Sequence, residues 1–380
     1  MRIDKITAIP ISYKVPEGQN VTLGIGRAVK RDAVLVKVET DEGLVGWGEA
    51  HHGRCPGAVA KLIDTTISEL VEGMDAFDVI TVWQRVYRMQ LASHGMGAAA
   101  AMALSGLDMA LWDIRGKAAG WPLYRMLGGA RRPVPAYAGG ISLGWQDPAA
   151  LVDEAVSYVE RGYTALKLRA GDAVKRDLAR VRAVRERIGS DVEILVDANA
   201  SYTLDDVRRV MPAFEELDVG WLEEPFPPHD DRSYADAVQL GSVPLAAGEN
   251  HFTRFEFSRL IDDGAVRILQ PDLSKCGGIT EAWRIASLAS AWKLPIHPHT
   301  SATGINMAAS IHFLAAIENC GYFEADVARH NPFRDSVGGN PSKLDADGCV
   351  WPMDAPGLGL QIDEAFLKAH PLIEGPCYVS

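Results

Sequence analysis

Seven polar residues recur at nearly constant intervals along residues 169–324, each at the end of a short apolar segment. They are Arg169, Asp197, Glu223, Glu249, Asp272, His299 and Glu324. The successive intervals are 28, 26, 26, 23, 27 and 25 residues. A strand, a helix and their connections fill about that length, so the repeat predicts consecutive strand–helix units. Because the parallel strands of a barrel end at one common mouth, the spacing places these side chains around that mouth.

The segments between these residues fit the same architecture. Short apolar runs alternate with helical patterns from about residue 133 onward, and the runs lie at 134–137, 165–168, 192–196, 219–222, 243–246, 266–269, 294–296 and 321–323. The helical patterns lie at about 148–161, 173–188, 203–216, 231–239, 255–262, 279–292 and 305–318. Eight strand signals predict a (β/α)8 barrel. The alternative, a doubly wound sheet, would need a Gly-rich phosphate loop after its first strand, and the chain has none.

Residues 1–125 have the pattern of a separate α+β unit. A strand is expected at 3–13, and two alternating segments at 33–39 and 44–50 are joined by Asp41-Glu42-Gly43, which predicts a hairpin. Helical patterns follow at about 57–72, 78–91 and 97–118. We therefore predict a first unit at 1–125, a barrel at 126–345, and a Gly/Pro-rich C-terminal segment at 346–380 that packs on the first unit.

Composition and charge narrow the possible partners and location. The 380 residues carry 50 acidic and 38 basic side chains, a net charge of −12, without a Lys/Arg run. This disfavours nucleic-acid binding and polybasic membrane attachment. The five cysteines form no CxxC pair, which disfavours a disulfide framework or a zinc site. The N-terminus lacks the apolar core of a signal peptide and no apolar run could span a bilayer, so we expect a cytoplasmic protein.

Three consecutive strand ends carry carboxylates, namely Asp197, Glu223 and Glu249. Clustered carboxylates repel one another unless a cation lies among them, and ligation by oxygen alone suits Mg²⁺ better than zinc. Acidic residues also stabilise the N-termini of helices, which is the alternative interpretation. Three in phase on neighbouring strands favour the metal site.

The next two strand ends suggest a proton-transfer pair. Asp272 can accept a hydrogen bond from Nδ1 of His299, which leaves the Nε2 atom of that ring for catalysis. His297, two residues earlier, is expected to be structural. On the opposite side of the barrel, Lys167 and Arg169 occupy alternate positions of one strand and so point the same way.

The ordered set of motifs resembles the enolase superfamily, and within it the mandelate racemase-like subgroup (the mandelate racemase/muconate lactonizing enzyme family). The resemblance covers nearly the whole chain and rests on residues 107–114 (LDMALWDI), 116–117 (GK), 196–199 (VDAN), 223–225 (EEP), 248–250 (GEN), 270–272 (QPD), 277–280 (GGIT) and His299. It implies an α+β capping domain over a modified (β/α)8 barrel. It also implies that Asp197, Glu223 and Glu249 bind Mg²⁺.

Two positions relate this chain to the subgroup: the sixth strand end agrees with its pattern, and the second-strand motif departs from it. Relatives resembling muconate cycloisomerase carry a catalytic Lys at the sixth strand end, whereas this chain has Asp272 there and His299 on the seventh. Lys275 lies past that strand end, and we interpret it as structural. The family's second-strand motif is usually Lys-x-Lys with the second Lys as base, but this chain has Lys167-Leu168-Arg169. Three hypotheses follow: Arg169 stabilises charge while His299 performs both proton transfers, Lys167 is the base, or Arg169 is an unusual base. The first is favoured, because arginine stays protonated.

The resemblance implies abstraction of the proton α to a carboxylate through an enediolate. Dehydration of an aldonate or aldarate to a 2-keto-3-deoxy acid is the favoured reaction, with His299 protonating the departing 3-hydroxyl and Glu324 hydrogen-bonding the substrate. The alternatives are cycloisomerisation of a sugar-acid lactone, racemisation or epimerisation of an α-hydroxy or amino acid, and an inactive Mg²⁺-binding relative with a structural role. A homo-oligomer, from dimer to octamer, is expected.

Specificity is expected to come from two loops of the first unit, at about 14–30 and 49–54. His52 and Arg54 are candidates for contacts with distal hydroxyls or a second carboxylate of a small carboxylate substrate. Asn199 and Lys167 complete the predicted substrate-binding residues.

Overall fold

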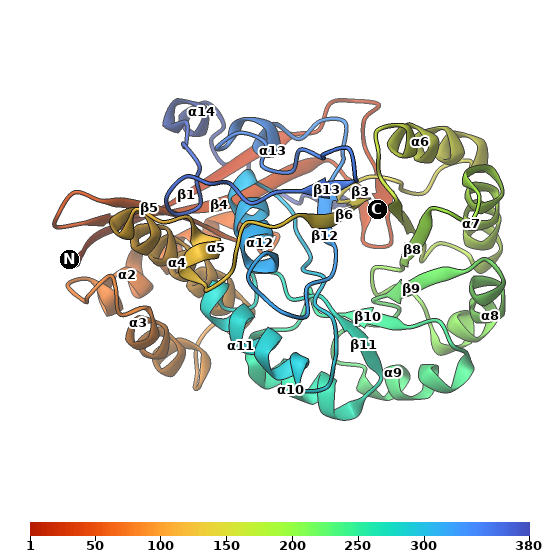
Figure 1. Cartoon of the computed structure of the whole chain (residues 1–380), viewed down its shortest axis with the longest axis horizontal. Helices are drawn as coiled ribbons and strands as arrows, with labels where there is room; N and C mark the ends of the chain where they lie inside the picture. Colours follow the sequence, from red (N-terminus) through yellow and green to blue (C-terminus); the bar gives the residue numbers. More distant parts are fainter.

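The computed structural model describes all 380 residues and shows two units (Figure 1). The first unit contains a three-stranded antiparallel sheet in the order β1 (Ile3–Lys14), β4 (Lys30–Thr40) and β5 (Val45–Ala50). The hairpin predicted for β4 and β5 is present, with Val34 opposite Ala50 and Glu39 opposite Val45.

Helices cover this sheet where the 3.6-residue periodicity predicts them. They are α1 (Pro56–Leu62), which continues through a wider turn into α2 (Ser68–Val71), α3 (Val79–Val86) and α4 (Ala98–Ala119). Helix α4 is buried along most of its length because it lies between β5 and the barrel helix α11 (Gly278–Ser290). Its close approach to β5 depends on Gly48, since a Cβ atom there would overlap the carbonyl oxygen of Gly106. α4 ends at Gly120, which has the left-handed conformation common after helices.

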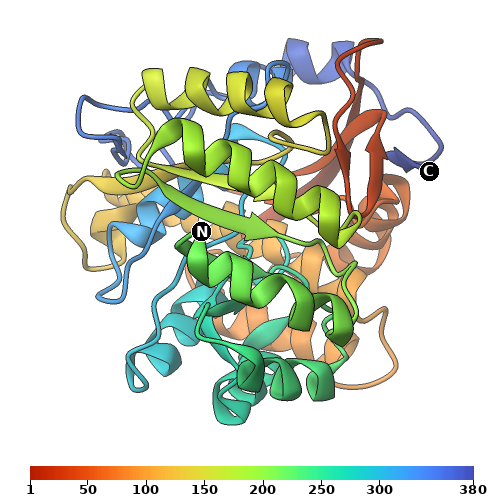
Figure 2. The same cartoon turned by 90° about the vertical axis from the view of Figure 1, so that its right-hand side faces the viewer.

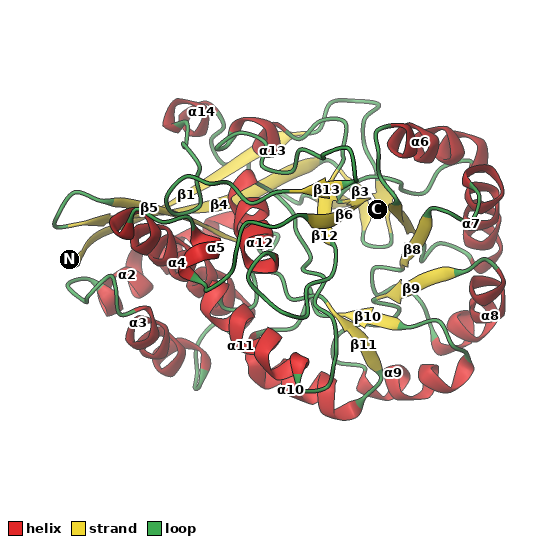
Figure 3. Ribbon diagram, viewed as in Figure 1, coloured by secondary structure: helices red, strands yellow, loops and turns green.

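The second unit is a modified barrel whose strands run parallel in one sheet. Its strands are β6 (Val134–Gly139), β7 (Ala165–Arg169), β8 (Glu193–Asp197), β9 (Val219–Glu223), β10 (Leu245–Ala247), β11 (Val266–Leu269) and β12 (Phe323–Asp326). They pair in the order β11-β10-β9-β8-β7-β6-β12. Figure 3 shows this arc of strands with helices around it.

The predicted seventh strand is the exception. Only Ile296 pairs within 294–296, bridging Leu269 on one side and Cys320 on the other. Pro295 and Pro298 flank this position, and proline has no N–H to donate to a ladder. The barrel is therefore closed at this point by a single bridge residue and not by a full strand.

Helices follow the strands on the outside of the barrel, as predicted. They are α6 (Pro148–Glu160), α7 (Val174–Ile188), α8 (Leu204–Glu216), α9 (Asp231–Ala237), α10 (Thr253–Asp263), α11 and α12 (Gly304–Leu314). Figure 2 shows α6, α7 and α8 packed side by side over the strands. The short helix α5 (Leu123–Met126) connects the two units. None of the helices combines the length and the hydrophobicity that a membrane-spanning helix needs.

The C-terminal segment contacts both units. After α13 (Pro332–Ser336), β13 (Cys349–Val350) pairs with β6 of the barrel. The chain then passes through α14 (Glu364–Ala369), and β14 (Tyr378–Val379) pairs with β3 (Gly26–Ala28), which in turn pairs with β2 (Thr22–Leu23). The end of the chain thus lies against the first unit, whereas the boundaries at 125 and 345 stay predictions.

Candidate active site

Strand alternation decides which side chains reach the inside of the barrel. Ala165, Leu195, Trp221, Ala246 and Ile268 form an apolar inner layer with Tyr137. Two residues further along their strands, polar side chains lie directly above this layer. These are Lys167 and then Arg169 on β7, Asp197 on β8, Glu223 on β9 and Gln270 after β11. The register places Arg169 beside Asp197, and Asp197 beside Glu223.

Each of the three predicted metal ligands faces a basic side chain of the protein. Asp197 accepts a hydrogen bond from the Arg169 guanidinium. Glu223 lies 2.7 Å from Lys167 Nζ through Oε1 and accepts from Gln270 through Oε2, also at 2.7 Å. Glu249 Oε2 lies 3.2 Å from His299 Nε2. The carboxylates are therefore gathered at the same mouth but are turned toward different partners, and their oxygens do not all lie within 4.8 Å of one another.

The donors at this mouth fit a hard divalent cation. All are oxygens, and two more buried oxygens nearby, Asn199 Oδ1 and Glu224 Oε1, have no hydrogen-bond partner. Burial raises the pKa of Glu223 to about 7, and repulsion from Asp197 adds to this against the charge of Lys167. A bound cation would relieve that repulsion and use the free oxygens. The assignment of Mg²⁺ to these three ligands stays a prediction.

The Asp272–His299 pair has the geometry that the sequence predicts. His299 Nδ1 lies 2.6 Å from Asp272 Oδ2, which identifies Nδ1 as the protonated nitrogen. The other oxygen, Oδ1, accepts from Ser274 N, Ser274 Oγ and Asn306 Nδ2 at 2.7, 2.6 and 3.1 Å. Burial disfavours the His299 imidazolium, but the Glu249 carboxylate outweighs it and raises the pKa of His299. The other ring nitrogen, Nε2, is not held by Asp272 and lies 3.2 Å from Glu249 Oε2 at the cavity.

His297 has the structural environment expected for it. Its Nδ1 accepts from the backbone N–H of Tyr322 at 2.9 Å, and its ring packs edge-on against Trp221. Burial lowers its pKa to about 4, so the ring is neutral at physiological pH.

Lys167 and Arg169 point the same way but lie at different depths. Lys167 is fully buried, with Nζ 2.7 Å from Glu223 and 2.9 Å from Glu324, and it does not line the cavity described below. Burial opposes its charge, but the two carboxylates raise its pKa well above the ordinary value. This position argues against Lys167 as the base or as a substrate ligand, because it lies two residues deeper in the barrel than Arg169. Arg169 does line the cavity and donates to Asp197 and to the Gly140 carbonyl.

The Glu324 carboxylate also has all its partners within the protein. Its side chain accepts from the N–H groups of Gly140 and Thr300, at 3.0 and 3.2 Å, besides pairing with Lys167. Burial opposes its charge, but the charges of Lys167, His299 and Arg169 lower its pKa to about 2. It does not line the cavity, so this geometry does not provide the substrate hydrogen bond that the resemblance implied.

A cavity lies between the barrel mouth and the first unit. Residues from all three parts of the chain line it, among them Ile25, His51, His52, Arg54, Arg169, Asn199, Glu249, Lys275, His299, Cys377 and Tyr378. His52, Arg54 and Asn199 therefore lie where the sequence places substrate contacts. Lys275 also lines the cavity, contrary to its interpretation as structural. The turn after β11 carries it back over the mouth, and its Nζ lies 3.5 Å from Glu249.

Several other lining residues had no individual role in the sequence prediction, among them Asp32, His51, Cys377 and Tyr378. His51 adjoins His52 and could have been found from that doublet. Cys377 and Tyr378 carried no signal, because they reach the cavity only through the pairing of β14 with β3.

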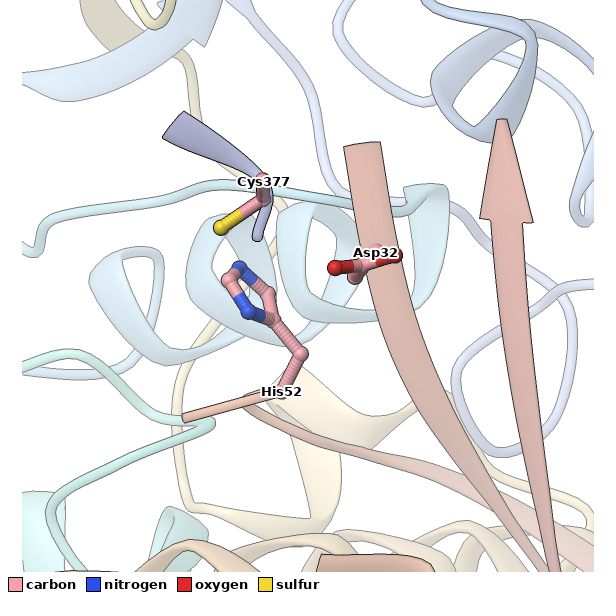
Figure 4. A group of neighbouring side chains, drawn as sticks. All are labelled: Asp32, His52 and Cys377. Carbon is pink, nitrogen blue, oxygen red and sulfur yellow. The ribbon is translucent and has the colours of Figure 1, made fainter. Parts of the chain in front are cut away.

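Asp32, His52 and Cys377 form the one group of three residues with ligand atoms within 4.8 Å of one another (Figure 4). Two contacts disfavour a metal there. The Lys30 ammonium lies 3.1 Å from Asp32 Oδ2 and already neutralises that carboxylate. His52 Nδ1 accepts the N–H of Arg54 at 2.9 Å, so Nε2 carries the hydrogen and has no lone pair for a metal. We interpret the group as part of the cavity wall.

Comparison with known proteins identifies relatives over the whole chain. The model for the enolase C-terminal domain-like family matches residues 150–366, and that for the mandelate racemase/muconate lactonizing enzyme N-terminal domain matches residues 6–128. An arabinonate dehydratase from Saccharolobus solfataricus is 35% identical over 342 residues, covering 89% of this chain and 90% of the relative. A D-galactarolactone cycloisomerase from Agrobacterium fabrum is 36% identical over 348 residues, covering 88% and 90%.

Solved structures agree with these matches. A member of the enolase superfamily from Polaromonas sp. JS666 superposes with a TM-score of 0.98 at 57% identity, covering 100% of both chains. A racemase from Streptomyces coelicolor A3(2) with bound magnesium superposes with a TM-score of 0.87 at 30% identity, covering 97% of this chain and 100% of that one. The relatives thus include lyases and isomerases on one fold.

Proposed function

This chain belongs to the mandelate racemase/muconate lactonizing enzyme family of the enolase superfamily, and on that premise we propose that it is a Mg²⁺-dependent sugar-acid dehydratase. The product would be a 2-keto-3-deoxy acid. The observation that carries the proposal is the proton-transfer chemistry at the mouth. His299, held by Asp272, faces the cavity, while the other base position of the family is occupied by Arg169.

A single base favours elimination over racemisation. Inversion at the α-carbon needs one group that removes the proton and another that returns it on the opposite face. Arg169 cannot serve as the second group, because its pKa lies above the already high ordinary value: burial opposes the charge but Asp197 and Glu324 outweigh it. In dehydration, one histidine can remove the α-proton and then protonate the leaving hydroxyl on the same face.

The residues divide the reaction as follows. Arg169 directs positive charge toward the carboxylate end of the substrate and is fixed by Asp197 and the Gly140 carbonyl. His299 Nε2 takes the proton from C2, and Asp272 stabilises the resulting imidazolium. The imidazolium then gives this proton to the 3-hydroxyl, which leaves as water, and the enol that remains becomes the 2-keto acid.

Asp197, Glu223 and Glu249 would hold Mg²⁺ in this proposal. The ion, when bound, supplies positive charge beside the substrate carboxylate as negative charge develops there. All other steps use side chains already in place. The hydrogen bond between His299 and Asp272 supports this assignment of the proton-transfer role.

Cycloisomerisation of a sugar-acid lactone is the second candidate function. It requires the same removal of an α-proton by one base, and the cycloisomerase from Agrobacterium fabrum is as similar to this chain as the dehydratase is. The two reactions differ in the leaving group, a free hydroxyl in one and the ring ester oxygen in the other.

A substrate screen tests the proposal. Aldonates and aldarates are incubated with Mg²⁺ and assayed with semicarbazide for 2-keto products, and lactones of the same acids are followed by proton NMR. We expect an acid sugar to be dehydrated by the wild-type protein and not by His299→Asn. Turnover of lactones alone would replace the proposal by cycloisomerisation. No turnover of any compound would refute both and favour a structural role without catalysis.

A further inference from the structure

Apart from Arg169, four Lys and Arg side chains line the cavity, and two of them are already paired within the protein. Lys30 lies 3.1 Å from Asp32 and donates to the carbonyls of Ile373 and Gly375. Arg31 lies 3.0 Å from Asp326. The charges of Lys30 and Arg31 are therefore balanced without a ligand.

Arg54 has no carboxylate within ion-pair distance. Its guanidinium lies over the ring of Tyr378 at 5.5 Å, which fixes it at the cavity wall without neutralising it. Its backbone has a φ of 58°, an uncommon conformation for a residue with a side chain. Arg54 is exposed to solvent, and its guanidinium is available to a ligand at the open side of the cavity.

Lys275 is the second cation without a partner of its own. It is buried and lines the cavity, and its one ion-pair contact is Glu249 at 3.5 Å. Glu249 also faces His299 at 3.2 Å, so its charge is shared. Burial opposes its charge, but Glu249 and the more distant Asp272 and Glu224 outweigh burial and raise the pKa of Lys275, so a charged ammonium lies at the cavity wall.

The two histidines of this wall present hydrogen-bond donors. His51 Nδ1 accepts from Gly53 N at 3.1 Å and His52 Nδ1 accepts from Arg54 N at 2.9 Å, so the hydrogen of each neutral ring is on Nε2. Burial, assisted by the charges of Lys275 and Arg54, lowers the pKa of His52 to about 3. This end of the cavity therefore offers N–H groups and positive charge.

We infer that the substrate is a diacid, an aldarate or a lactone of one, whose second carboxylate binds between Arg54 and Lys275 with the N–H groups of His51 and His52 nearby. The inference rests on the proposed function, which places the reacting carboxylate at the barrel mouth. An aldonate would bring a neutral CH₂OH group to the same place, leaving Arg54 without a carboxylate partner and Lys275 with only its shared contact to Glu249. A second carboxylate supplies the missing charge and accepts the hydrogen bonds.

Matched substrate pairs test the inference. D-Galactonate and galactarate have the same configuration at their hydroxyl-bearing carbons and differ only in the group at C6; gluconate with glucarate and mannonate with mannarate extend the set. In the pair that contains the best substrate, we expect the diacid to have a kcat/KM about tenfold to a hundredfold higher, the range typical of charged hydrogen bonds. An equal or better aldonate overturns the inference and leaves the dehydratase proposal intact.

An Arg54→Met variant tests the role of the cation itself. We expect it to lower kcat/KM for the diacid by about tenfold or more, mainly through KM, and to change that for the aldonate by less than threefold. Arg232→Met, at an arginine that is 92% exposed, is the matched control and should change neither. For Lys275→Gln, the measured quantity is the ratio of kcat/KM for the diacid to kcat/KM for the aldonate. Partial misfolding would lower both values equally and leave this ratio unchanged. Equal losses on both substrates in Arg54→Met and Lys275→Gln overturn the inference.

Binding separates this inference from the failure of the proposed function. If no acid sugar is turned over, titration calorimetry with galactarate and D-galactonate still compares the binding of a C6 carboxylate with that of a C6 CH₂OH group. Tighter binding of galactarate that is lost in Arg54→Met supports the diacid site, and equal binding of both compounds refutes it.

Discussion

Replacing Asp272 by Asn should reverse the tautomer of His299 without moving the ring. Three donors, Ser274 N, Ser274 Oγ and Asn306 Nδ2, point at Oδ1 of Asp272. In Asp272→Asn the amide oxygen must take that position, since an NH₂ group there would face three donors. The NH₂ group is then placed 2.6 Å from His299 Nδ1, in the position of Oδ2. Nδ1 becomes an acceptor and the hydrogen of the neutral ring moves to Nε2.

The loss of activity follows from this geometry. With its hydrogen on Nε2, the neutral ring has no lone pair directed at the α-proton of the substrate. A positioned general base contributes about 10²–10⁴-fold, so kcat should fall by about that factor while the fold is retained. Ser274→Ala is the matched control: it removes one hydrogen bond to Oδ1 but leaves the contact between Asp272 and His299, and kcat should stay within about threefold.

Two measurements examine the tautomer reasoning independently. Steady-state kinetics on the substrate found by the screen gives kcat. Nitrogen-15 NMR of histidine-labelled protein, with the His299 signals assigned from the His299→Asn spectrum, reports which ring nitrogen is protonated. A variant Asp272→Asn with nearly wild-type kcat, or with hydrogen still on Nδ1 of His299, would refute the reasoning.

Four further substitutions or conditions have expected outcomes. Arg169→Lys should lower kcat/KM by about tenfold to a hundredfold in steady-state assays, because an ammonium cannot contact both Asp197 and the Gly140 carbonyl; an increase would show that a base is needed there. Lys167→Met should lower the free energy of unfolding in urea by about 3–5 kcal/mol, since it leaves Glu223 and Glu324 buried without their cation. Glu223 has a raised pKa of about 7 and must lose its proton to bind Mg²⁺, so calorimetry should show an affinity that falls up to about tenfold per pH unit below pH 7 and is nearly constant above it. Gly48→Ala should lower the free energy of unfolding by about 1–3 kcal/mol, because its Cβ would overlap the Gly106 carbonyl of α4; an unchanged urea midpoint would contradict this packing.

The fold and the barrel mouth could be predicted because both follow from local periodicity. The interval between Asp197 and Glu223 reflects one strand–helix unit, and the register in the structure indeed places these residues side by side. The parity of Lys167 and Arg169 likewise follows from the two-residue period of a strand. Pro295 and Pro298 also indicate in the sequence that the seventh strand cannot form a full ladder. The apolar run at 294–296 nevertheless predicted a strand there.

What the sequence did not reveal is which charge pairs with which. Lys167 and Arg169 look equivalent in sequence, yet one is closed off by Glu223 and Glu324 and the other faces the cavity. Lys275 was placed by the path of a turn, and Tyr378 by strand pairing between the two ends of the chain. Such contacts depend on tertiary packing and have no period that a single sequence could show.

Lys167 forms ion pairs with both Glu223 and Glu324, and the different surroundings of the two carboxylates explain their different roles. Both side chains are fully buried, and both lie within 3 Å of Lys167 Nζ. Glu324 also accepts two backbone N–H groups. Burial opposes its charge, but Lys167, His299 and Arg169, with the Gly140 N–H, lower its pKa to about 2. For Glu223, burial and repulsion from Asp197, Glu324 and Glu249 instead outweigh the charge of Lys167 and raise the pKa to about 7. Glu324 is therefore the permanent counter-ion of Lys167, so Glu223 can turn toward a cation without leaving the buried ammonium unpaired.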